Sequence, residues 1–116
     1  MNNDQDASFF CDMNGIPTAL RKQHMELTKE VFGAVRSMRE LPNRYMFEIP
    51  NKPGFLMKTA EFIDRERLCC PFFSFAIQVE SEGGAIWLHL TGPDGVKPFI
   101  QAEIGQGLDE GISKVF

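Results

Sequence analysis

Residues 45–55 read Tyr-Met-Phe-Glu-Ile-Pro-Asn-Lys-Pro-Gly-Phe, and this stretch carries a strand, a break and the start of a helix. Tyr45, Phe47 and Ile49 occupy alternate positions, which is typical of a strand with one buried face. The Pro-Gly step that ends at Gly54 interrupts the chain before an amphipathic segment. The stretch therefore predicts a strand that leads directly into a helix.

The same pattern returns forty-one positions later. Residues 86–90 read Ile-Trp-Leu-His-Leu, and after four residues Gly95 opens another amphipathic segment. Each of these strands follows another predicted strand, at 35–41 and 72–79, across a short turn. We therefore predict two ββα units; the alternative is that strand–turn–helix segments resemble one another without any repeat.

A further helix is predicted ahead of the two units. Pro17 suits a first helical turn, and Leu20, Leu27 and Val31 follow at helical spacing, with His24 on the same stripe. This stripe makes His24 a core histidine in preference to a ligand. The expected fold is α+β, with an N-terminal helix and a four-stranded, mainly antiparallel sheet on which the helices pack.

Length and composition indicate one globular domain. The chain has 116 residues, 43% of them hydrophobic and 24% charged, which fits a single packed core and excludes a disordered or collagen-like chain. Eleven Phe stand against one Trp and one Tyr, so we expect a core built on Phe. We predict a flexible tail over residues 1–8 and a single domain over 9–116.

Charge and terminal sequence restrict the partners. The net charge is −4 and the twelve Lys and Arg are scattered, which argues against nucleic acid as a partner. The first residues are polar and acidic rather than signal-like, and no long apolar run suggests a membrane span. Three cysteines, two of them adjacent, suit a reducing compartment, so we expect a cytoplasmic protein.

The adjacent pair Cys69-Cys70 is the strongest chemical signal in the chain. Neighbouring Cα atoms lie ~3.8 Å apart, below the usual ~4.4–6.8 Å of disulfide partners, so a bond between the two would be strained. The pair is therefore interpreted as two thiols, as a clamp for a soft metal, or as a redox switch that tolerates strain. Arg65 and Arg67 favour thiolates here, whereas the helix end that precedes Pro71 opposes them.

Cys11 is a candidate third ligand. Three thiolates from Cys11, Cys69 and Cys70 would suit a soft cofactor ion such as monovalent copper, zinc, mercury or trivalent arsenic. Structural zinc normally takes four ligands with Cys-x2-Cys spacing, which this chain lacks. The alternative is that the cysteines are small buried hydrophobes where the helix meets the strand.

Two further places are candidate ligand sites. Glu66 continues the apolar row of its helix toward Cys69 and Cys70, although a partly exposed or salt-bridged helix residue is the plainer interpretation. Trp87 and His89 lie on the sheet face away from the predicted core, where an aromatic ring and polar groups can line a small-molecule pocket. We judge it more plausible that the N-terminal helix or a second subunit of a homodimer covers this face.

The chain resembles a family of small, uncharacterised bacterial proteins with no established activity. The resemblance rests on Cys11-Asp12-Met13, on the segment Glu66-Arg67-x-Cys69-Cys70-Pro71-Phe72, and on the Trp-x-x-Leu-Thr-Gly-Pro-Asp-Gly-Val run at 87–96. It implies a shared fold and a shared site, and no reaction. The chain does not resemble thioredoxins, organomercurial lyases or heavy-metal-associated ferredoxin-like domains, because it has no Cys-x-x-Cys.

Three functions remain open, in this order. The first is a thiol protein that binds a soft metal or metalloid, or senses oxidants, through Cys69, Cys70 and Cys11. The second is a ligand-binding or dimeric interaction module in which the cysteines only pack. The third is a small enzyme with Cys69 or Cys70 as nucleophile and Glu66 or a histidine as base. The sequence names no metal, substrate or reaction.

Overall fold

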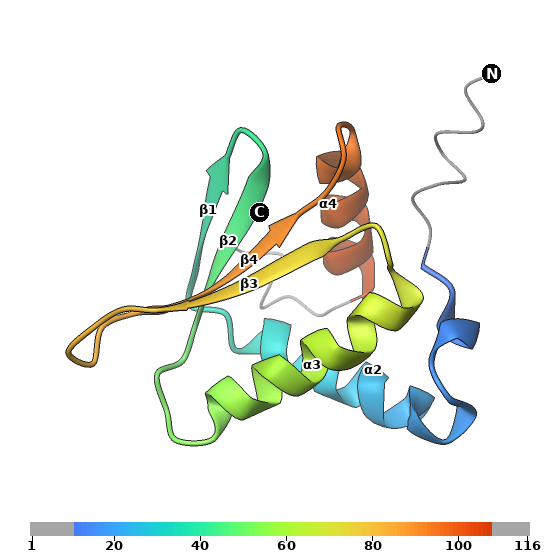
Figure 1. Ribbon diagram of the computed structural model, residues 1–116, viewed down its shortest axis with the longest axis horizontal. Helices are drawn as coiled ribbons and strands as arrows, with labels where there is room; N and C mark the ends of the chain where they lie inside the picture. The colour runs from blue at the N-terminus through green and yellow to red at the C-terminus, as the bar shows by residue number, and fades with distance from the viewer. Residues whose placement is uncertain (1–10, 108–116) are drawn as a thin grey trace.

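A computed structural model of the protein describes residues 11–107, with side chains described through residue 102. Its helices and strands follow the predicted order, as Figure 1 shows. A short 3-10 turn precedes an N-terminal helix, and two strand–strand–helix units come next. The elements are η1 (Met13–Gly15), α2 (Thr18–Gly33), β1 (Ser37–Leu41), β2 (Arg44–Ile49), α3 (Phe55–Cys69), β3 (Ser74–Val79), β4 (Ile86–Thr91) and α4 (Val96–Gly107).

The four strands form one antiparallel sheet in the order β1-β2-β4-β3. The two central strands are the two copies of the repeated pattern, and Phe47 of β2 pairs directly with Leu88 of β4. These residues are forty-one positions apart, the spacing of the repeat. Each ββα unit therefore contributes one hairpin, and the hairpins join through their equivalent strands. The α+β prediction is confirmed.

In both units a glycine directly precedes the helix. Gly54 lies directly before α3 with φ of 87°, and Gly95 lies directly before α4 with φ of 89°. A positive φ of this size strains residues that carry a Cβ atom, so glycine suits both positions. The shared conformation explains why the sequence pattern repeats through the break as well as through the strand.

The helices cover one face of the sheet. Phe32 of α2, Phe62 of α3 and Ile100 of α4 pack in one cluster with Phe47 and Leu88. Phe32 meets Phe47 and Phe62 edge-on, with ring centroids 5.2 and 5.4 Å apart. The prediction of a Phe core is borne out by these contacts.

The expectation that the N-terminal helix covers the Trp87 face is wrong. The side chains of α2 pack with Leu88 and Leu90, whereas Trp87 and His89 occupy the alternate positions of β4 and face the other side of the sheet. The physical reason is that α2 has a single apolar stripe, which packs against α3 and the core face of the sheet. No second apolar stripe of α2 is left to cover the other face. The second-subunit alternative stays a prediction.

The residues before α2 dock on the end of α3, as Figure 1 shows. The backbone N–H of Asp12 donates to the carbonyl of Cys69 at 2.8 Å. Ile16 is fully buried against Cys69 and Cys70. Gly15 passes so close to the Leu68 carbonyl that a Cβ atom would overlap it. This docking brings the N-terminal segment to the two adjacent cysteines.

A few boundaries differ from the sequence-based expectation. The first strand begins at Ser37 rather than residue 35, because Ala34 and Val35 still donate backbone hydrogen bonds to carbonyls of α2. The third strand begins at Ser74 rather than residue 72, because Phe73 donates to the Cys70 carbonyl in a turn. The predicted tail and the outermost parts of the predicted domain lie outside the described residues. Across 11–107, no helix is long and apolar enough to cross a membrane.

We predict that Gly15→Ala destabilises the protein and Gly33→Ala does not. The new methyl at position 15 meets the Leu68 backbone, whereas a methyl at position 33 has open space. We expect Gly15→Ala to lower the free energy of unfolding by about 1–3 kcal/mol in urea titrations, since overpacking of a tight contact costs this much. The control variant Gly33→Ala should leave the free energy of unfolding unchanged or raise it by up to about 1 kcal/mol. Equal stability of the two variants would contradict this docking.

Candidate thiol and metal site

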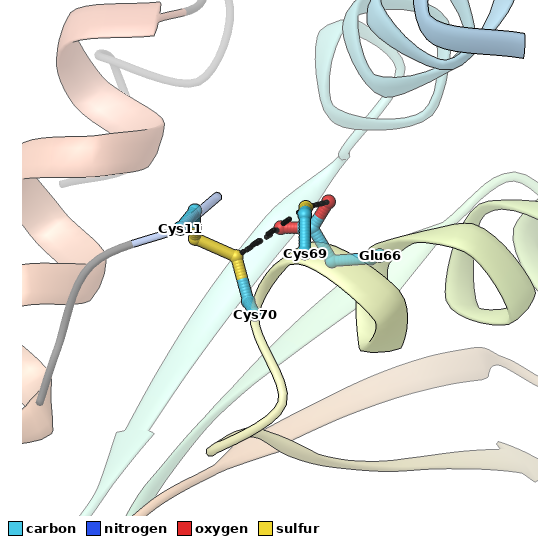
Figure 2. Close-up of side chains that lie close together, drawn as sticks. All are labelled: Cys11, Glu66, Cys69 and Cys70. Carbon is cyan, nitrogen blue, oxygen red and sulfur yellow. Dashed lines mark hydrogen bonds between the residues drawn. A yellow bond between two sulfur atoms is a disulfide. The ribbon is translucent and has the colours of Figure 1, made fainter. Parts of the chain in front are cut away.

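The three cysteines converge at the end of α3. Cys11 and Cys70 form a disulfide across 59 positions of sequence, with Cα atoms 4.6 Å apart. The sulfur of Cys69 lies 3.7 Å from that of Cys70. Figure 2 shows the three cysteines side by side with Glu66. The pairing corrects one expectation, because Cys70 is not a thiol beside Cys69 in this structure but is bonded to the distant Cys11. No strained bond between neighbours is needed.

The geometry follows from the way in which α3 ends. Cys69 is the last helical residue, and Cys70 leaves the helix with φ of −126° and ψ of 71°. Pro71 excludes a further helical turn, since a proline pushes the residue before it out of the α region. Both cysteines are buried, as are Thr59 and Phe62 earlier on the same helix.

Glu66 points at the sulfurs from one turn earlier on α3. Its Oε1 accepts a hydrogen bond from the Cys69 thiol at 3.7 Å, and its Oε2 lies 3.3 Å from the Cys70 sulfur. In the disulfide Cys70 has no hydrogen to donate, so the second hydrogen bond belongs to the reduced protein. The side chain is 18% exposed, which makes Glu66 an inward-facing carboxylate at the edge of the site.

His24 holds Glu66 from the opposite helix. The ring Nε2 lies 2.7 Å from Glu66 Oε1, so Nε2–H donates to the carboxylate. The ring stacks on Phe62 with centroids 5.6 Å apart, and Nδ1 has no hydrogen-bond partner. His24 is a core histidine, as its stripe predicts, yet its contact with Glu66 was not predicted. The signal was present, because His24 and Glu66 both continue apolar rows of their helices.

The two arginines pair with carboxylates of their own helix. Arg65 donates to Glu61 at 2.7 Å and Arg67 donates to Asp64 at 3.1 Å, both along the outer side of α3. Glu61 and Arg65 stand four positions apart, the spacing of an ion pair along one helix. A carboxylate of α3 therefore engages each guanidinium, and the expected support of thiolates by Arg65 and Arg67 stays a prediction.

The reduced residues would fit a soft metal ion. One ligand atom from each of Cys11, Glu66, Cys69 and Cys70 lies within 4.8 Å of all the others. Metal–sulfur bonds of ~2.3 Å in tetrahedral geometry set the sulfurs about 3.8 Å apart. The Cys69–Cys70 separation of 3.7 Å matches this spacing. Cys11 and Cys70 have to move apart, and reduction of their disulfide permits that movement.

Trp87 and His89 lie away from this cluster, on the far face of the sheet. His89 Nε2–H donates to Gln78 at 2.9 Å, and its Nδ1 accepts from Arg44 at 3.1 Å. Burial, and then the Arg44 guanidinium, lower the pKa of His89. The guanidinium of Arg39 lies 4.7 Å above the Trp87 ring. The two residues do not join the cysteine site, and their role as a separate ligand site stays a prediction.

Comparison with known proteins adds no family. No protein-family model matches the chain, and neither a curated protein nor a solved structure matches it. The resemblance to small bacterial proteins with the Glu-Arg-x-Cys-Cys-Pro-Phe segment therefore stays a prediction. The functional argument depends on the geometry of the site itself.

We predict that His89 makes stability depend on pH below neutrality. Its folded pKa lies below the ordinary value, so the unfolded chain takes up the proton first as the pH falls. The stabilisation by neutral His89 is complete above about pH 6.5 and is lost as the pH drops below that value. Urea unfolding of wild type and His89→Gln from pH 8 to pH 5 measures this.

The stability advantage of the wild type over His89→Gln should shrink toward pH 5. Glutamine does not titrate, whereas all other titratable groups are common to the two proteins. An advantage that stays constant or grows as the pH falls would contradict the buried, neutral state of His89.

Proposed function

We propose that this protein binds a soft metal or metalloid ion through Cys11, Cys69 and Cys70 when they are reduced. The observation that supports it best is the convergence of these residues and Glu66, whose ligand atoms lie within 4.8 Å of one another. The site joins an N-terminal segment to a helix end, so its residues meet only in the folded chain. In this proposal the Cys11–Cys70 disulfide is the form that cannot hold the ion.

The ligand set favours a soft ion. Thiolate ligands select ions such as zinc, monovalent copper or trivalent arsenic over magnesium and calcium, which prefer oxygen. Three sulfurs satisfy an ion that takes three ligands. For zinc, which takes four, an oxygen of Glu66 is the fourth ligand. Cysteines bind as thiolates, so their protons must leave when the ion enters. Before the ion enters, Glu66 accepts hydrogen bonds from the Cys69 and Cys70 thiols.

The disulfide makes the site sensitive to oxidants. Oxidation joins Cys11 to Cys70 and releases two protons and two electrons, which a small disulfide such as oxidised glutathione takes up as two thiols. The oxidised protein retains Cys69 and Glu66 and loses two of the three sulfur ligands. Metal binding and oxidant sensing are therefore alternative states of the same residues.

We predict that the reduced protein binds one zinc or arsenite ion per chain and that the oxidised protein does not. The protein is reduced, freed of reductant without air, and titrated calorimetrically with each ion. Cys69→Ser and Cys70→Ser should each weaken binding by at least about tenfold, since loss of a direct ligand costs no less than loss of a supporting contact.

Glu66→Gln tests the carboxylate, with Glu61→Gln as the matched control on the outer side of the same helix. We expect weaker zinc binding only in Glu66→Gln. Binding that is equally tight in the oxidised protein, or unchanged in both serine variants, would contradict the proposed function.

A further inference from the structure

A cavity of about 180 Å³ adjoins the sulfur cluster. Cys11, Glu66 and Cys69 form part of its wall. The exposed side chains Met25 and Lys29 of α2 also line it, so the cavity reaches the surface. A ligand can thus enter from solvent and end beside the thiols.

The rest of the wall is apolar and largely aromatic. Four phenylalanines and two aliphatic residues form most of it, namely Phe32, Phe62, Phe73, Phe75, Leu90 and Ile100. Met13, His24 and Thr28 complete the wall. Protein interiors rarely leave voids larger than a water molecule. A cavity of roughly 150 Å³ lined by Leu, Ile and Phe is enough to bind benzene. This cavity therefore has the size and lining for one six-membered aromatic ring.

One buried polar atom in the wall also lacks a partner. His24 lines the cavity and is 2% exposed. Within the described part of the chain, its Nδ1 is the only fully buried side-chain nitrogen or oxygen atom without a hydrogen bond. Buried polar atoms are normally paired. A hydrocarbon group gives this nitrogen no partner, so the occupant is inferred from the size and apolar lining of the cavity.

We propose that the ligand of this site is an organic compound of trivalent arsenic, in which the arsenic carries a hydrocarbon group. The arsenic binds Cys69 and one of the sulfurs released by reduction, and the aryl or alkyl group fills the aromatic cavity. This inference rests on the proposed function and adds the class of ligand. It explains why the soft ligands adjoin an apolar cavity rather than a polar one.

The binding step balances without any redox partner. An aryl arsenical with two hydroxyl groups reacts with two protein thiols. Two As–O bonds break, two As–S bonds form, and each thiol proton leaves with a hydroxide as water. Arsenic stays trivalent. Because the carbon group takes the third position on arsenic, two thiols are sufficient, whereas inorganic arsenite uses three.

The test compares phenylarsine oxide with inorganic arsenite on the reduced, full-length protein. Thr28 lines the cavity from the half-buried side of α2, so Thr28→Phe fills it. Thr18→Phe is the matched control, at an exposed position of the same helix that does not line the cavity. Ile100→Phe fills the cavity from α4 and serves as a second variant.

We expect Thr28→Phe to weaken phenylarsine oxide binding about tenfold or more, because burial of one phenyl ring contributes at least this factor. Arsenite binding should stay within about twofold, which also shows that the variant folds. Cys11→Ser should weaken arsenite binding more than phenylarsine oxide binding, since Cys69 and Cys70 remain.

Two results would overturn the inference. If Thr28→Phe and Ile100→Phe both leave phenylarsine oxide binding unchanged while arsenite still binds, the cavity does not hold the organic group and the proposed function stands alone. If the reduced wild type binds neither compound, the proposed function fails and this inference fails with it.

Discussion

Pro71 imposes the constraint on which both the fold and the site depend. It ends α3 at Cys69, so the chain turns at Cys70 and starts β3 three residues after the proline. The same termination leaves the Cys69 carbonyl without a helical partner, and the backbone N–H of Asp12 supplies one at 2.8 Å. That hydrogen bond places Cys11 beside Cys70. One helix end thus sets where β3 begins and closes the thiol cluster.

Electrostatics at this helix end explain why an ion would be needed to stabilise thiolates. The C-terminal end of a helix disfavours negative charge. Arg65 and Arg67, the cations nearest in sequence, are engaged with Glu61 and Asp64 on the outer side of α3. A bound cation supplies its own positive charge and so favours the thiolate form. In the oxidised state the helix end faces no thiolate charge from Cys70, because the sulfur atoms of a disulfide are neutral.

The sequence predicts the architecture better than it predicts the site. The repeat through Phe47 and Leu88 carries both the alternation of the strands and the glycine before each helix, so local patterns were sufficient for the α+β fold. The trio of cysteines was also anticipated. Its disulfide was not, because the approach of Cys11 depends on the close passage of Gly15 over the Leu68 carbonyl, a tertiary contact that no local pattern encodes.

The pairing of His24 with Glu66 shows the same limit. Each residue continues an apolar row of its own helix, but the rotation of α2 against α3 decides which rows meet. The expectation that α2 covers the Trp87 face of the sheet was wrong for a related reason. A single apolar stripe on α2 can serve only one face of the sheet, and the Phe core takes it.

The central claim is that three sulfurs from two distant segments hold one ion. X-ray absorption at the arsenic edge of the reduced protein, loaded with one equivalent of arsenite, tests it most directly. The account predicts three sulfur neighbours for arsenic in the wild type and two in Cys11→Ser. Two or fewer sulfur neighbours in the wild type, or a count that Cys11→Ser leaves unchanged, would contradict it.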